Sequence, residues 1–160
     1  MFFLETAIAI FIGAFLLTYL TIPKIIGVVE YKRLMDDPNQ RSSHTTKTPT
    51  LGGMAFFYTL ILAIFFIKDK DLFDEALYII PGLTILFIVG LKDDLVVLSP
   101  GSKLIAQVLA VSFILSNESF TIHSLNGFLN INEIPYYLYI AIGGFMMLTI
   151  INSYNLIDGI

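Results

Sequence analysis

The chain alternates long apolar blocks with short polar segments, and its apolar residues come in runs rather than in amphipathic periods. Runs of about 20 apolar residues are typical of transmembrane helices, because they match a hydrocarbon core about 30 Å thick. The pattern predicts an all-α polytopic membrane protein, with one membrane domain of about five helices over residues 1–160. The expected spans are roughly residues 3–22, 50–67, 76–91, 104–118 and 136–152.

Three of these spans carry distinctive residues. The second starts near Gly52-Gly53, which suits a flexible start, a close helix contact or a backbone surface near a ligand. The third is marginal in length and contains Pro81-Gly82, which predicts a kink or an unwound turn. The fourth is short and carries Gln107, so a membrane-surface helix is an alternative. Before it, Ser99 is expected as N-cap and Pro100 as the first helical residue.

The segment between the last two spans has a different pattern. Polar and apolar residues alternate over Phe120–His123, and Asn126-Gly127 follows. An Asn-Gly pair between alternating runs is typical of a β-hairpin. We therefore expect a small extracytoplasmic β-hairpin over residues 120–134.

Composition strengthens the membrane interpretation. The chain is 56% hydrophobic, with a mean hydropathy of +0.82, far above the range of soluble domains. It has no cysteine, which excludes disulfides and thiolate zinc sites. The expected surroundings are a lipid bilayer, and no nucleic-acid partner is expected.

The positive charges predict the orientation in the membrane. If the loops alternate between two sides, seven of the nine Lys and Arg residues share the side of segments 24–49, 92–103 and the tail from Asn152. Cytoplasmic loops carry such an excess. We therefore expect a multi-pass protein of the inner (plasma) membrane, with this side in the cytoplasm and the N-terminus outside.

The pair Asp93-Asp94, at the end of the third block, is the main candidate for chemistry. Two carboxylates about 5 Å apart repel by roughly 3 kcal/mol at an effective dielectric constant near 20. A raised pKa, a nearby cation or a bound divalent metal relieves that repulsion. A solvated loop end is the alternative explanation.

Other polar residues of the expected cytoplasmic side extend this candidate site. Asn152, Asn155 and Asp158 recur every three residues, so they form one polar stripe if the last helix continues that far. With Lys103 and the Asp93-Asp94 pair, they predict a site for a metal and a phosphorylated ligand.

Four motifs in order resemble the polyprenyl-phosphate N-acetylhexosamine-1-phosphate transferases (glycosyltransferase family 4), and the resemblance spans the whole chain. They are Arg41-Ser-Ser-His44 with Pro49-Thr-Leu-Gly-Gly53, Gly90-Leu-Lys-Asp93-Asp94, Leu98-Ser-Pro-Gly-Ser-Lys103-Leu-Ile-Ala-Gln107 and Asn152-Ser-Tyr-Asn155-Leu-Ile-Asp158-Gly159. The first and last motifs look closer to the undecaprenyl-phosphate GlcNAc-1-phosphate transferase branch than to the lipid I synthase branch.

The resemblance implies a reaction and its partners. A sugar-1-phosphate, GlcNAc-1-phosphate in the nearer branch, passes from a UDP-N-acetylhexosamine to undecaprenyl phosphate, releasing UMP and starting cell-envelope glycan synthesis. Mg²⁺ is the implied cofactor, with Mn²⁺ as an alternative, and a homodimer is a candidate assembly. The alternatives are a lipid I synthase-type phospho-MurNAc-pentapeptide transferase and an inactive membrane fragment.

The resemblance also implies site residues. The expected catalytic residues are Asp93, Asp94 and Asp158, and the expected substrate-binding residues are His44, Lys103, Asn152 and Asn155. Asp94 and Asp158 would lie near the metal, and Asp93 would orient or deprotonate the lipid phosphate. The lysine would contact the pyrophosphate, and the asparagines would hold substrate or metal-bound water. The histidine either contacts a phosphate or caps a loop.

The resemblance carries an expectation about length as well. Family members have about ten or eleven spans, so the sequence is expected to be the N-terminal half of such a fold, ending at Ile160 within a motif. An intramembrane aspartyl protease fits less well, because its Asp residues lie within helices in a Gly-x-Gly-Asp context, unlike Gly90–Asp93.

Overall fold

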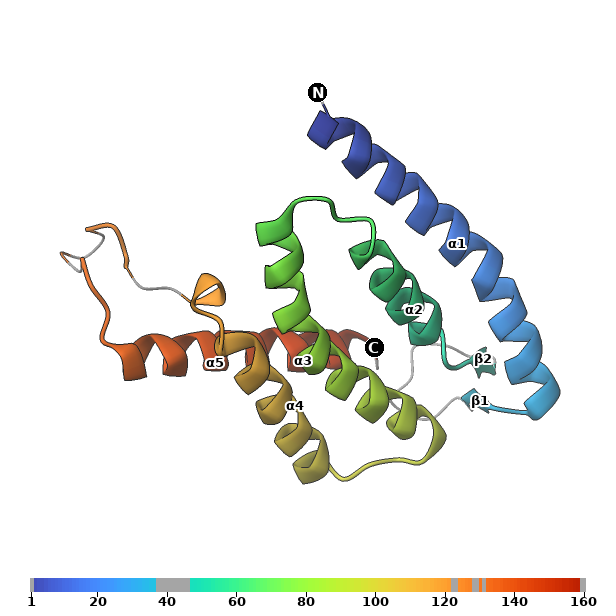
Figure 1. The fold of residues 1–160 in the computed structure, drawn as a ribbon. Helices are drawn as coiled ribbons and strands as arrows, with labels where there is room; N and C mark the ends of the chain where they lie inside the picture. Colours follow the sequence, from blue (N-terminus) through green and yellow to red (C-terminus); the bar gives the residue numbers. More distant parts are fainter. Residues whose placement is uncertain (1, 37–46, 122–123, 128–129, 131, 159–160) are drawn as a thin grey trace. The chain divides into compact units, whose positions relative to one another are not determined.

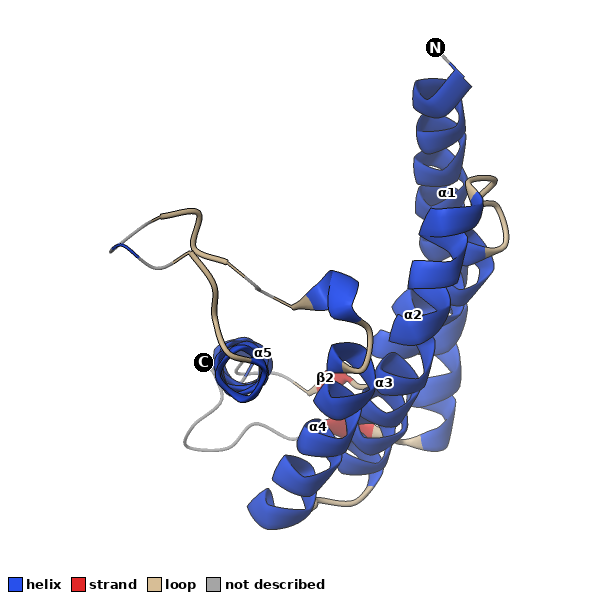
Figure 2. Ribbon diagram, turned by 60° about the vertical axis from the view of Figure 1, so that its left-hand side comes forward, coloured by secondary structure: helices blue, strands red, loops and turns tan. Residues whose placement is uncertain are grey.

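The computed structural model describes residues 2–36, 47–121, 124–127, 130 and 132–158, and its regular structure is almost entirely helical (Figures 1 and 2). Its elements are α1 (Phe2–Lys32), β1 (Met35–Asp36), β2 (Thr48–Pro49), α2 (Gly53–Ile64), α3 (Lys70–Leu95), α4 (Pro100–Leu115), the 3₁₀ turn η1 (Glu118–Phe120) and α5 (Tyr136–Asp158). Five α-helices confirm the predicted all-α class.

The chain divides into two compact units. The first holds residues 1–76 and 87–97, and the second holds residues 77–86 and 98–160. In the first unit α1 packs against α2, and in the second α4 packs against α5. The long helix α3 contributes residues to both units.

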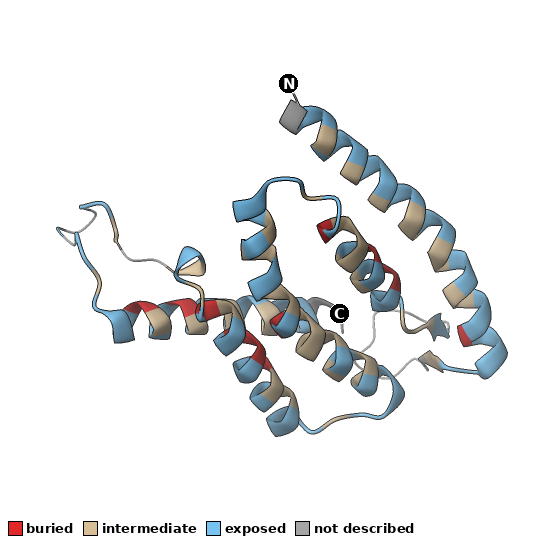
Figure 3. Ribbon diagram, in the orientation of Figure 1, coloured by how far each residue is buried: buried red, intermediate tan, exposed pale blue. Residues whose placement is uncertain are grey.

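In the described part of the chain, three helices are long and apolar enough to cross a membrane: Leu4–Lys32, Lys70–Leu95 and Tyr136–Asn155. The apolar helices α2 and α4 have 12 and 16 residues, or about 18 and 24 Å at a rise of about 1.5 Å per residue. Most of the helix residues are exposed or only half-buried (Figure 3). Large apolar residues are among the exposed ones, and Phe11 and Phe145 are 71% and 72% exposed. Surfaces of this kind suit lipid. The chain is a membrane protein.

Helix α1 is longer than its expected span. It continues through Pro23 to Lys32, where a cation in the last turn suits the negative end of the helix dipole. Against α2, the Thr18 hydroxyl donates a hydrogen bond to the buried Thr59 hydroxyl over 3.1 Å. Beyond Ile64, i→i−3 hydrogen bonds extend α2 as a tighter turn to Ile67, the expected end of the second span.

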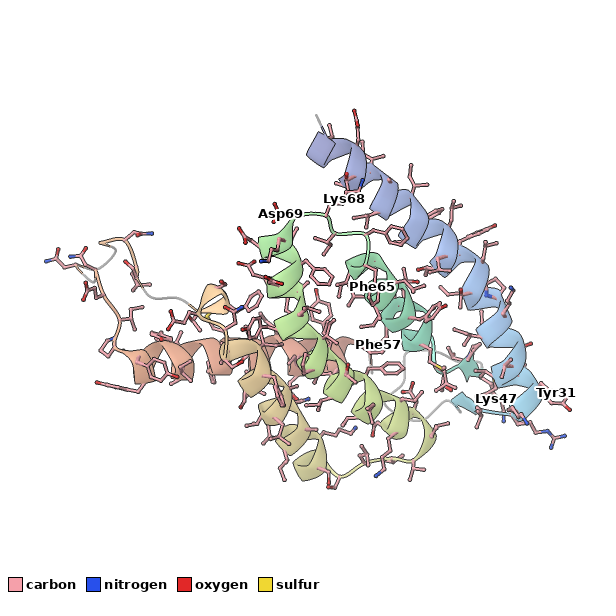
Figure 4. All side chains as sticks on the ribbon, in the orientation of Figure 1. Tyr31, Lys47, Phe57, Phe65, Lys68 and Asp69 are labelled. Atoms are coloured by element: carbon pink, nitrogen blue, oxygen red, sulfur yellow. The ribbon has the colours of Figure 1, made fainter. Side chains whose placement is uncertain are left out.

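Helix α3 is longer than the expected third span and is continuous. It begins at Lys70, well before residue 76, because Asp69 caps it by accepting a hydrogen bond from the Leu72 N–H over 3.0 Å (Asp69 is labelled in Figure 4). It also runs through Pro81-Gly82 without an unwound turn. Membrane helices tolerate proline where neighbouring groups compensate the lost hydrogen bond. Buried Gly82 packs so closely on α4 that an added Cβ would lie 2.7 Å from the Ala110 carbonyl oxygen.

The hairpin expected over residues 120–134 is found only at its turn. Asn126 and Gly127 form a turn with φ of 50° and 82°, the left-handed region that Asn-Gly turns use. The described residues of this segment contain no strand, and it begins with η1. His123 lies outside the described residues.

Candidate functional site

The acidic pair Asp93-Asp94 lies in the last turn of α3, not in the loop beyond it. Asp93 is half-buried and Asp94 is exposed. Carboxylates in the last turn of a helix face the negative end of its dipole, which costs about 0.3–1 kcal/mol each, whereas the cation of Lys92 is favoured there. Helix geometry therefore adds to the mutual repulsion of the pair and favours a bound cation.

The backbone of Leu51 contacts this acidic end. Its N–H donates a hydrogen bond to Oδ2 of Asp94 over 3.3 Å. Leu51 has a φ of 68°, in the left-handed region that costs a non-glycine residue about 1–2 kcal/mol. Local strain of this size persists where the surroundings fix the conformation. The start of α2 is thus held beside the carboxylate of Asp94.

The first polar loop is closed at its base. β1 and β2 form an antiparallel pair with Met35 opposite Pro49, and the Thr50 hydroxyl donates to the Leu34 carbonyl over 2.7 Å. The Arg41–His44 motif, including His44, lies outside the described residues. Its loop therefore leaves and returns next to the Leu51–Asp94 contact.

The glycines that follow Leu51 are not close packing contacts. Gly52 and Gly53 are exposed, and a Cβ added at either would meet no described atom within 4 Å. Of the three explanations open from the sequence, a close helix contact is therefore not supported. The open space leaves a flexible start or a ligand-facing backbone.

In the second unit, Lys103 lies in the first turn of α4. Ser99 caps the helix as expected, because its Oγ accepts from the Ser102 N–H over 3.3 Å, and Pro100 is the first helical residue. Lys103 is half-buried. A cation in the first turn of a helix is disfavoured by the dipole, and a phosphate group nearby would offset that cost.

Helix α5 continues to Asp158, so the condition for the predicted polar stripe is met. Asn152, Asn155 and Asp158 lie one turn apart along it, and their positions drift slowly around the helix. Asn152 is half-buried and Asn155 is exposed. The stripe occupies the last two turns of the helix.

Asn152 is held by a partner that the sequence did not assign to it. Its Nδ2 donates to Oε1 of Gln107 over 2.9 Å and to the Leu148 carbonyl over 2.8 Å, and its Oδ1 accepts from Nε2 of Gln107 over 3.3 Å. Gln107 is only 6% exposed. The buried amide of α4 is therefore satisfied by the first residue of the α5 stripe.

A groove of about 630 Å³ between α1 and α2 lies apart from these residues. Its walls are mainly alanine, leucine, isoleucine and phenylalanine. Glu5 and Lys68 also lie among its lining residues, and Lys68 is labelled in Figure 4. No candidate residue lines it. The groove lies beside the N-terminal half of α1. Leu51, which contacts Asp94, comes after the C-terminal end of α1 in the sequence.

The candidate residues offer the type of ligand atom, carboxylate oxygen, that a hard divalent cation binds. Mg²⁺ prefers one or two carboxylates together with phosphate oxygens and water, and Asp93-Asp94 supplies carboxylates at a helix end that favours a cation. Within the described residues of either unit, no three His, Asp or Glu side chains converge. A divalent cation held by these carboxylates would need further ligands from substrate and water.

Two functional groups were missed from the sequence. The Leu51 N–H was not predictable, because its direction depends on a left-handed backbone that no residue type indicates. Gln107 was noted only as a polar residue in a short span. The missed signal was that a buried amide needs a hydrogen-bonding partner on another helix.

Comparison with known proteins gives a consistent result. The model of glycosyl transferase family 4 matches residues 76–160, more than half of the chain. The phospho-N-acetylmuramoyl-pentapeptide-transferase of Staphylococcus haemolyticus is 27% identical over 92% of this chain and 52% of its own length. The undecaprenyl-phosphate alpha-N-acetylglucosaminyl 1-phosphate transferase of Thermotoga maritima is 29% identical over 79% of this chain and 37% of its own.

The chain spans about half the length, or less, of these curated relatives. No solved structure matches it significantly. The family match covers the acidic end of α3, Lys103 and the α5 stripe, so it includes every candidate residue except His44. The chain belongs to glycosyl transferase family 4.

Proposed function

We propose that this chain transfers a sugar-1-phosphate from a UDP-sugar to undecaprenyl phosphate, releasing UMP. The observation that carries the proposal is the family match over residues 76–160, which contains six of the seven candidate residues. Within that region, Asp94 is joined to the loop base through Leu51.

The reaction forms one bond and breaks one bond. An oxygen of the lipid phosphate attacks the phosphorus that carries the sugar, a new P–O–P bond forms, and the P–O bond to UMP breaks. Catalysis of phosphoryl transfer rests mainly on positioning and on neutralising charge. Asp93 is proposed to orient the lipid phosphate or accept its proton, and Lys103 to contact the pyrophosphate of the UDP-sugar.

We propose Mg²⁺ as the cofactor, held by Asp94 and Asp158, with Mn²⁺ as a substitute. When bound, the ion neutralises phosphate charge as a Lewis acid. The Leu51 N–H holds one carboxylate oxygen of Asp94 in place. Asn155 is exposed on the stripe, where it is proposed to contact substrate.

We propose GlcNAc-1-phosphate as the transferred group. The Arg41-Ser-Ser-His44 and Asn152–Asp158 motifs support this branch, and the Thermotoga maritima relative is named for this transfer. The Staphylococcus haemolyticus relative is named for phospho-MurNAc-pentapeptide, which is the competing candidate. In cells, lipid-linked GlcNAc would start a cell-envelope glycan, including lipopolysaccharide-type glycans.

The site is proposed to face the cytoplasm of the inner membrane, where UDP-sugars are made. The charge bias over seven of nine Lys and Arg residues supports this orientation. It places the N-terminus outside. Cysteine scanning with a membrane-impermeant reagent tests it, because a cysteine at Lys68 should be labelled in intact cells and one at Val97 should not.

The function is tested by incubating the chain with undecaprenyl phosphate, Mg²⁺ and either radiolabelled UDP-GlcNAc or UDP-MurNAc-pentapeptide. We expect lipid-linked product from UDP-GlcNAc and none from Asp93→Asn. If only UDP-MurNAc-pentapeptide gives product, the chain would instead be assigned to the lipid I synthase branch. Absence of product from both, while the Thermotoga maritima relative is active, would reject the proposal for this chain.

A further inference from the structure

The amide pair between Gln107 and Asn152 determines what Asn152 can offer a ligand. The two side chains exchange hydrogen bonds in both directions, over 2.9 and 3.3 Å. Asn152 also donates to the Leu148 carbonyl over 2.8 Å. These contacts join α4 to α5 within the second unit, where Gly143 packs against Leu115.

The Leu148 carbonyl fixes which way the Asn152 amide faces. A backbone carbonyl is only an acceptor, so the atom of Asn152 beside it has to be the Nδ2 donor. That choice turns Oδ1 of Asn152 toward Nε2 of Gln107, and Oε1 of Gln107 toward Nδ2. The Leu148 carbonyl thus identifies the donor end of the Asn152 amide, and the reciprocal bonds with Gln107 hold the amide in that orientation.

The hydrogen-bonding capacity of Asn152 is then almost used up. An asparagine amide has two donor hydrogens and two acceptor lone pairs. Both hydrogens of Asn152 are engaged, by Gln107 and by Leu148, whereas Oδ1 accepts one bond. Counted over the residues that the structure describes, Asn152 therefore retains one acceptor site and no donor. It is suited to an O–H group and not to a phosphate oxygen, which is itself an acceptor.

The burial of Gln107 explains why the two amides keep this orientation. Gln107 is buried on the face of α4 that also buries Ala110 and Val111. A buried amide without a partner is costly, so Gln107 holds Asn152 in this orientation. Asn152 itself is half-buried rather than enclosed, and it begins the stripe that continues to Asn155 and Asp158.

We infer that Gln107 is a positioning residue, which holds the Asn152 amide so that the second acceptor site of its carbonyl oxygen serves a hydroxyl donor of the ligand. This inference rests on the proposed function. The donor is an O–H group, and two sources share that chemistry: a hydroxyl of the UDP-sugar, or a water molecule on the divalent cation. Two binding experiments distinguish them: UDP-GlcNAc with EDTA present, and Mn²⁺ without nucleotide.

The test compares three variants of the full chain in detergent. Gln107→Met removes the amide but keeps the length of the side chain. The exchange Gln107→Asn with Asn152→Gln keeps an amide pair between α4 and α5 but moves the second carbonyl by one methylene. Ser112→Ala is the control, because that exposed hydroxyl donates to the Val108 carbonyl of its own helix. Calorimetry measures UDP-GlcNAc, electron paramagnetic resonance measures Mn²⁺, and a melting curve measures stability.

We expect Gln107→Met to weaken binding of one probe by about three- to tenfold, the effect of one hydrogen bond, and to lower the melting temperature. The exchange should recover most of the melting temperature without recovering binding, and Ser112→Ala should match the wild type. The probe affected identifies the source of the hydroxyl.

Two results would overturn the inference alone: unchanged binding of both probes by Gln107→Met, or recovery of binding together with stability in the exchange variant. Failure of the wild type to bind either probe would instead overturn the proposed function, and the inference with it.

Discussion

The backbone N–H of Leu51 donates a hydrogen bond to Oδ2 of Asp94 over 3.3 Å, and it does so from a left-handed conformation with a φ of 68°. Two segments 43 residues apart in the sequence therefore meet, the start of α2 and the acidic end of α3. This contact is the structural link between the Gly-Gly motif and the Asp-Asp motif.

The strain at Leu51 predicts an unusual order of stability. Leu51→Ala and Leu51→Gly both remove the side chain, but only glycine adopts a positive φ without a steric penalty. We expect the free energy of unfolding of Leu51→Gly, measured by denaturant titration, to be about 1 kcal/mol larger than that of Leu51→Ala. Equal stability of the two variants, or greater stability of the alanine variant, would contradict the left-handed backbone.

Two glycines of α3 should respond oppositely to alanine. At Gly82 an added Cβ would lie 2.7 Å from the Ala110 carbonyl oxygen, and at Gly90 it would meet nothing within 4 Å. We expect Gly82→Ala to destabilise by about 1–3 kcal/mol and Gly90→Ala to be neutral or stabilising by up to about 1 kcal/mol. Thermal unfolding in detergent measures both. Similar effects at the two positions would reject the close contact between α3 and α4.

The Thr18–Thr59 hydrogen bond should contribute modestly to the α1–α2 contact. Thr59→Val keeps the shape of the buried side chain and removes its hydroxyl, so we expect a loss of about 0.6 kcal/mol, the average for such bonds between membrane helices. Thr21→Val is the matched control, because the Thr21 hydroxyl donates to the Leu17 carbonyl of its own helix. A loss at Thr21 as large as at Thr59 would show that the bond between the helices adds nothing.

Metal removal should stop the proposed transfer and leave the fold intact. The helix geometry at Asp93-Asp94 disfavours uncompensated carboxylates, so a bound cation is expected to lower that cost. We expect EDTA to abolish product formation, Mg²⁺ to restore it, and the circular dichroism spectrum to stay helical throughout. Full activity in EDTA would contradict a role for a divalent cation.

The class of fold was predictable from the sequence because long apolar runs form α-helices when they cross a membrane. The sequence also predicted the cap at Ser99 and the turn at Asn126-Gly127, where local chemistry decides the conformation. It did not predict that α3 begins as early as Lys70. Of the kink or unwound turn expected at Pro81-Gly82, the unwound turn is not found, and no strand flanks the Asn-Gly turn in the described residues. In each of these cases the outcome depends on packing or capping that residue patterns do not reveal.

The site was predictable as a set of residue types and not as contacts. Asp93, Asp94 and Asn152 stand out because carboxylates and amides follow apolar runs. Their observed partners, the Leu51 N–H and the Gln107 amide, come from distant segments. Pairing over such separations depends on how the helices pack, which the sequence of one chain does not specify.

The most direct test of the central claim is the release of UMP from UDP-GlcNAc in the presence of undecaprenyl phosphate and Mg²⁺, measured for the wild type and Asp94→Asn. We predict one UMP for each lipid-linked GlcNAc formed. We also predict a loss of at least about 100-fold in Asp94→Asn, the scale of losing one interaction that stabilises transition-state charge, because Asp94 is proposed to hold the cation. The melting temperature of the variant should stay within a few degrees of the wild type. Wild-type rates in Asp94→Asn, or UMP release that does not need the lipid phosphate, would contradict the account.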